Sequence, residues 1–187
     1  MIRFLVSAWL VTALVPSAKA QMTAFCLPGQ NGVINCPCAN PPAMSGSGCN
    51  NFGPTPPGGT GGATLDANGA AIADPSNNIQ FVITGEQGTL TVLFCGTTAL
   101  PAGVVSGAGV RCVGGSLRRS YSGSPTLGAI LFPNPSSPTD AWTASGSPNS
   151  GTTRYYYAVY RNMDAVTPCG SPSSNFNTTN AGSLTWL

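Results

Sequence analysis

The chain has 187 residues, no histidine and a formal net charge of only +2. These values exclude catalytic sites built on an imidazole base. They also exclude the basic stripe with which a nucleic-acid-binding surface neutralises phosphates. The length suits a single domain, and the 24 glycines and 17 prolines favour short elements joined by turns.

Residues 1–20 have the pattern of a secretory signal. Arg3 supplies the positive start, Phe4 to Val15 the apolar stretch, and Ala18-Lys19-Ala20 the cleavage site. The apolar stretch is too short to cross a bilayer as a helix, and no later stretch is apolar enough to do so, so we expect no membrane span after cleavage. The exported chain would carry no lysine, no net charge and no nucleic-acid partner. We expect it to be secreted, whether extracellular, at the cell surface or periplasmic.

Residues 21–61 are predicted to form a disulfide-stapled N-terminal loop region, which residues 54–62 close as a linker or wide turn. Glycine, proline, asparagine and serine dominate it, and such a segment buries too little apolar surface to offset its ordering entropy. Disulfides formed in an oxidising compartment would contribute about 2–4 kcal/mol each. The chain has seven cysteines: Cys26, Cys36, Cys38, Cys49, Cys95, Cys112 and Cys169.

The pairing of these cysteines is only partly determined by their spacing. Cys36 and Cys38 are too close in sequence to pair without strain. Two schemes remain for the loop region, Cys26–Cys36 with Cys38–Cys49 or Cys26–Cys38 with Cys36–Cys49, and we favour the second. We expect Cys112 to pair with Cys169. Cys95 is then left as a buried free thiol, with an intermolecular disulfide or a reactive thiol as the alternative.

Residues 62–187 are predicted to form the β-sandwich domain. Strand patterns occur at 63–67, 70–73, 79–84, 89–95, 104–113, 116–121, 128–132, 152–162, 176–179 and 183–187. Asn68-Gly69 predicts a tight hairpin between the first two segments, and residues 85–88 predict a second hairpin loop. The inward side chains of the two strands flanking that loop would be Ile79, Phe81 and Ile83, then Leu90, Val92 and Phe94.

The clearest strand is the tyrosine-rich stretch 152–162. Alternation places Tyr155, Tyr157 and Val159 on one face and Arg154, Tyr156, Ala158 and Tyr160 on the other. No segment after the signal shows a sustained helical period. We therefore predict an all-β fold, a single antiparallel β-sandwich of about eight or nine strands, jelly-roll or immunoglobulin-like, with a closed barrel as the alternative.

The residue types that remain in the chain disfavour catalysis. Without lysine in the exported chain there is no Schiff base or phosphate-binding P-loop. Glycoside hydrolysis usually takes two carboxylates. The single glutamate, Glu86, has the sequence context of a loop residue. A hydrolase that uses a pair of aspartates is therefore the least favoured function. A metal site at Cys36-Pro37-Cys38 is disfavoured because no histidine is present. We predict no cofactor and no metal. Asn177-Thr178-Thr179 matches a glycosylation acceptor.

Binding through aromatic side chains is a stronger alternative. Tyr155, Tyr156, Tyr157, Tyr160, Tyr121 and Trp142 could form a platform on which sugar rings stack. The competing interpretation is that these rings form the core and shield a sheet face, with Arg154 and Arg161 covering tyrosine rings or extending from the sheet edge.

Several short motifs resemble an uncharacterised family of secreted bacterial proteins. They are Phe25-Cys26, Cys36-Pro37-Cys38-Ala39-Asn40, Gly48-Cys49, Gly109-Val110-Arg111-Cys112, Tyr157-Ala158-Val159-Tyr160-Arg161-Asn162, Phe176-Asn177-Thr178-Thr179-Asn180 and Thr185-Trp186. The resemblance implies an exported β-rich domain and adds no activity, ligand or catalytic residue.

From the residues we predict a secreted, non-catalytic structural or adhesive protein. The alternative is a carbohydrate-binding module that uses the aromatic sheet face, and an aspartate-based hydrolase comes last. The partner would be an extracellular polysaccharide or another cell-surface protein.

Overall fold

The computed structural model describes residues 21–51, 61–73, 78–133, 148–162 and 175–187. These residues contain ten strands and no helix, and every strand pair is antiparallel, so the predicted all-β antiparallel fold is confirmed. The strands are β1 (Thr23–Cys26), β2 (Thr64–Asn68), β3 (Gln80–Thr84), β4 (Thr91–Gly96), β5 (Thr98–Ser106), β6 (Gly109–Gly114), β7 (Arg118–Gly123), β8 (Ala129–Phe132), β9 (Thr153–Arg161) and β10 (Phe176–Thr185).

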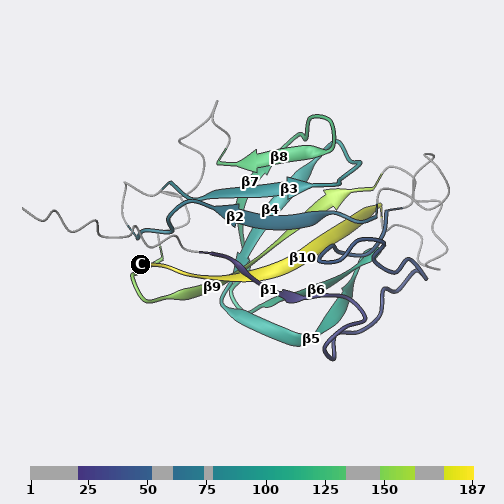
Figure 1. The fold of residues 1–187 in the computed structure, drawn as a ribbon, viewed down its shortest axis with the longest axis horizontal. Coiled ribbons are helices and arrows are strands. Elements are labelled where there is room, and N and C mark those ends of the chain that lie inside the picture. Colours follow the sequence, from purple (N-terminus) through teal and green to yellow (C-terminus); the bar gives the residue numbers. More distant parts are fainter. Residues whose placement is uncertain (1–20, 52–60, 74–77, 134–147, 163–174) are drawn as a thin grey trace, which may run out of the picture.

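The strands form three sheets that stack as layers (Figure 1). The central sheet has five strands in the order β1-β10-β9-β4-β7. A three-stranded sheet, β2-β3-β8, packs on one of its faces, and the β5-β6 hairpin packs on the other. The sandwich therefore has a second, smaller interface in addition to the expected one.

The interface with the three-stranded sheet, here called the first core, is apolar. Its largest buried side chains include Phe81, Phe132, Tyr156 and Trp186. The Phe81 and Tyr156 rings lie 4.7 Å apart between their centroids. Because such rings remove large apolar areas from water, this interface supplies most of the burial energy of the fold.

The interface with β5-β6, here called the second core, is smaller and contains three of the disulfide-bonded cysteines. Cys26, Cys49 and Cys112 are fully buried there beside Val110 and Val113. β1 belongs to the central sheet through its pairing with β10. The N-terminal segment is therefore joined to the sandwich by a strand as well as by disulfides.

Strand β9 alternates as its sequence predicts. Tyr156 and Ala158 lie in the first core, and Tyr155, Tyr157 and Val159 lie in or against the second. The neighbouring strand β4 is likewise covered on both faces. The predicted set of inward residues is therefore incomplete. Leu93, which was not predicted to point inward, is fully buried, whereas Leu90, which was, is 39 % exposed.

Both short hairpins expected near the start of the domain are wrong. β2 pairs with β3 rather than with residues 70–73, because that segment bonds to Leu187 instead: Leu187 N donates to Ala71 O and Ala73 N donates to Leu187 O. β3 and β4 belong to different sheets, so residues 85–88 cross between layers.

Two other segments are divided into strands differently from the prediction. Residues 104–113 are not one strand but the end of β5, a tight turn and β6, with Ser106 opposite Gly109. Gly107 has a φ of 62°, which suits the first turn position of a two-residue hairpin. Conversely, residues 176–185 form one strand, β10, interrupted by a bulge between Thr178 and Ala181.

The disulfides also differ from the favoured scheme. Cys36 pairs with Cys49, as in the second alternative, but Cys26 pairs with Cys112. The expected Cys26–Cys38 and Cys112–Cys169 pairings are therefore wrong. Cys38 is also disulfide-bonded, Cys95 is a free thiol, and Cys169 lies outside the described residues.

Candidate functional site

The tyrosine-rich strand does not present an aromatic platform to solvent. Tyr156, Tyr157 and Tyr160 are at most 4 % exposed, and burial raises the pKa of each hydroxyl above its usual value. Tyr155 is half-buried with its ring edge-on to Phe25. Tyr121 is buried and stacks on Phe132, and Trp142 lies outside the described residues. These tyrosines are core residues.

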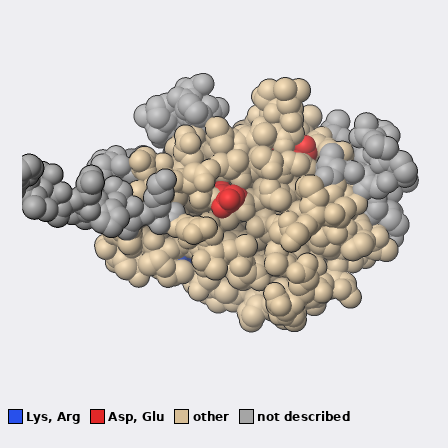
Figure 2. All heavy atoms as spheres, viewed as in Figure 1, with Lys and Arg blue, Asp and Glu red and all other residues tan. Residues whose placement is uncertain are grey.

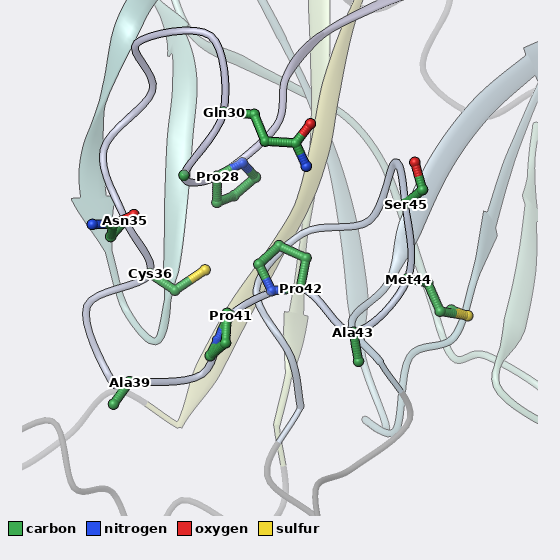
Figure 3. Close-up of a pocket in the computed structure, with 11 residues that line it drawn as sticks. Pro28, Gln30, Asn35, Cys36, Ala39, Pro41, Pro42, Ala43, Met44 and Ser45 are labelled. Carbon is green, nitrogen blue, oxygen red and sulfur yellow. The ribbon is translucent and has the colours of Figure 1, made fainter.

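A hollow in the N-terminal segment is a candidate binding site among the described residues. It has a volume of about 500 Å³. Figure 3 shows Pro28, Gln30, Cys36 and Pro42 around the same space, with the Met44 side chain pointing away from them. The lining residues are Pro28, Gly29, Gln30, Asn35, Cys36, Ala39, Pro41, Pro42, Ala43, Met44 and Ser45, and we call this hollow the proline groove.

The proline groove is chemically neutral. Its lining contains no charged and no aromatic side chain. Proline rings and the Cys36–Cys49 disulfide provide apolar surface, and the exposed amides of Gln30 and Asn35 can both donate and accept hydrogen bonds. The groove therefore suits an uncharged partner with polar groups along one side.

Main-chain hydrogen bonds and covalent links hold the groove in shape. Gly29 N donates to Ile34 O at 3.1 Å and Ile34 N donates to Ala102 O of β5 at 2.9 Å. The Asn40 amide donates to Asn50 O and Ala108 O at 2.8 and 3.0 Å. A loop fixed in this way loses little conformational freedom when it binds a partner.

Buried asparagines on β10 also link separate segments of the chain through hydrogen bonds. The Asn177 amide donates to Cys49 O at 2.9 Å. The Asn180 side chain accepts from Leu65 N at 2.6 Å and donates to Leu65 O at 3.1 Å, which satisfies the open edge of β2. Because Asn177 is fully buried, the glycosylation motif at 177–179 is not accessible in the folded chain.

Glu86 is the residue that sequence reasoning undervalued. It lies in the loop between β3 and β4 but is only 2 % exposed, and the Thr91 hydroxyl donates to its Oε2. Burial raises the pKa of Glu86 to about 7, and the hydrogen bond from Thr91 opposes that rise. Its flanking glycines gave the appearance of an ordinary surface turn, and no periodic pattern distinguished it.

The carboxylates in the described part of the chain do not form a catalytic pair. The two acidic residues that the structure describes are Asp66, exposed on β2, and the buried Glu86. Asp74, Asp140 and Asp164 lie outside the described residues. Within the described ranges, no group of three or more His, Cys, Asp or Glu residues could hold a metal ion.

Arginines approach the free thiol from the neighbouring strands. Cys95 of β4 lies opposite Arg118 of β7 and Tyr156 of β9. Burial raises the pKa of the Cys95 thiol, although a hydrogen bond with Tyr156 and the positive charges of Arg154 and Arg118 act in the opposite direction. The net direction disfavours a reactive thiolate at neutral pH. Arg161 is exposed at the end of β9.

Comparison with protein-family models, with curated proteins and with solved structures found no significant match. The resemblance to a family of secreted bacterial proteins therefore stays a prediction. Among the strands and loops that could be described, no helix is long and apolar enough to cross a membrane.

Proposed function

We propose that the protein is a secreted, non-catalytic structural or adhesive component of the cell exterior and that it contacts its partner through the proline groove. The disulfides support folding in an oxidising compartment. The signal-like residues 1–20 support export.

The observation that carries this proposal is the neutrality of a preformed groove. Charged residues are also sparse on the molecular face drawn in Figure 2, so long-range electrostatic steering contributes little to encounter. Contact would depend on shape, apolar burial and neutral hydrogen bonds. Such a surface suits a persistent structural contact with an uncharged polymer or protein.

The alternative, a carbohydrate-binding module built on the aromatic sheet face, loses its support because Tyr156, Tyr157 and Tyr160 are buried. A neutral polysaccharide nevertheless remains a ligand to test, because the groove amides of Gln30 and Asn35 are exposed.

The test compares two isosteric substitutions. Gln30→Glu places one negative charge in the groove, whereas Gln80→Glu places the same charge on an exposed position of β3. We measure binding of labelled protein to the surface of the producing cells and to purified surface polysaccharide. Gln30→Glu should weaken binding about tenfold or more, because an unpaired charge loses hydration in a neutral contact.

Gln80→Glu should bind like the unsubstituted chain. Equal binding by all three proteins would exclude the groove as the contact surface. Turnover of the surface polymer by the purified chain would exclude a purely structural function.

A further inference from the structure

Three buried oxygen atoms near one end of the sandwich have no hydrogen-bond donor among the described residues. They are Glu86 Oε1, Gln87 Oε1 and Asn162 Oδ1. Buried polar atoms are almost always paired, and an exception commonly marks an ordered water or an ion. All three atoms are of one chemical kind, carboxyl or amide oxygens, which act as acceptors when the carboxyl is ionised.

The main chain brings these residues to the same place. Glu86 and Gln87 are consecutive in the loop that crosses from β3 to β4. The next residue, Gly88, lies so close to the end of β9 that an added Cβ would come within 1.9 Å of Arg161 O. Arg161 N also donates to Leu90 O at 2.9 Å. The loop therefore runs directly beside Arg161 and Asn162.

The side chains of Glu86 and Asn162 also share one face of the central sheet. Thr91, which donates to Glu86, lies opposite Tyr160 in the β4–β9 ladder. Because side chains alternate along an extended chain, Asn162 lies on the same face as Tyr160, two residues earlier. Glu86 and Asn162 are each only 2 % exposed.

The chemistry of these three oxygen atoms indicates which class of metal ion they would bind. A carboxylate together with amide carbonyls is the set that Ca²⁺ takes in proteins, usually completed by main-chain carbonyls and water. Thiolate and imidazole ligands, which softer metals prefer, are absent from this set. A cation would also compensate the negative charge of a buried carboxylate, which is costly when unpaired.

We propose that Glu86, Gln87 and Asn162 form a binding site for a hard divalent cation of the Ca²⁺ type where β3 crosses to β4. This site is separate from the proline groove and does not depend on the adhesive function. Bound cation would tie the β3–β4 loop to the end of β9 and so stabilise the junction between two layers.

The experiment is a calorimetric titration of the chelator-treated protein with CaCl₂ at a mildly alkaline pH, where carboxylates are ionised. The thermal midpoint is followed in parallel, and NaCl of equal ionic strength is the reference. Binding should saturate with a Kd on the order of 10⁻⁴ to 10⁻³ M, the range of extracellular modules.

Matched variants make the result specific. Glu86→Gln keeps the shape of the side chain and should weaken Ca²⁺ binding at least about tenfold. Asp66→Asn removes the same charge from an exposed position of β2 and should leave binding unchanged. Asn162→Asp adds a ligand charge and should tighten binding, a gain that a misfolded protein could not show. Absence of saturable binding, or equal binding by Glu86→Gln and the unsubstituted chain, would overturn the proposal.

Discussion

The two faces of the central sheet are covered by different means. The first core is built from large apolar side chains, among them Phe81, Phe132 and Trp186. The second core has fewer apolar residues and depends on disulfides, such as Cys26–Cys112, and on buried asparagine side chains. The comparison indicates that covalent and polar links replace burial where the N-terminal segment has little apolar surface to offer.

The largest effect is expected from removing the Cys26–Cys112 disulfide, whose partners are 86 residues apart. Replacing both cysteines by alanine should lower the free energy of unfolding by about 4–5 kcal/mol, because this closed loop is long. The same replacement at Cys36 and Cys49, 13 residues apart, should cost about 3 kcal/mol. Urea unfolding measures both, and equal losses would contradict the loop-length argument.

A slightly smaller effect is expected from Phe81→Ala in the first core. Phe81 is fully buried against Tyr156, so its truncation should cost about 3–4 kcal/mol of unfolding free energy. The proline groove should keep its structure, since it belongs to the other face. Hydrogen exchange of amides near Gly29 and Ile34 checks this, and increased exchange there under native conditions would show that the two cores are coupled.

An intermediate effect is expected at the link between layers. Asn180→Ala should leave the main-chain N–H and C=O of Leu65 without partners, and each lost bond of this kind costs about 1–2 kcal/mol. Ser183→Ala is a suitable control, because that hydroxyl makes only a 3.5 Å exposed contact to Thr23 O. If both variants unfold at the same denaturant concentration, the hydrogen bonds between Asn180 and Leu65 do not contribute to stability.

The smallest effect, and one of opposite sign, is expected in the turn between β7 and β8. Leu127 has a φ of 52° and is fully exposed, a conformation that a bulky residue adopts at a cost but asparagine tolerates. Leu127→Asn should therefore raise the free energy of unfolding by about 0.5–1 kcal/mol. A lower thermal midpoint for this variant would show that the leucine makes a stabilising contact.

Sequence reasoning was most successful where local alternation decides the outcome. Ile79, Phe81 and Ile83 are buried as their spacing predicts, and β9 places its tyrosines on two faces as expected. Leu90 was misassigned because β4 begins only at Thr91. The fully buried Leu93 was missed because a strand covered on both faces has no polar side by which alternation could identify the inward residues.

Long-range choices could not be predicted from local patterns. Asn68-Gly69 has the sequence of a tight hairpin, but residues 71–73 bond to Leu187, which lies far away in the sequence. Likewise, Cys26 meets Cys112 because β1 and β6 are brought together by their common neighbour β10. Sheet order decides both outcomes, and spacing within a short segment carries no information about sheet order.

The pairing of β1 with β10 has a consequence for how the polypeptide reaches its native state. Thr23 and Ser183 are neighbours although 160 positions separate them. Closing so long a loop is entropically costly, and domains dominated by such contacts fold slowly. The central sheet cannot be completed until residues 176–185 have been synthesised, so assembly of this sheet has to wait for the last strand of the chain.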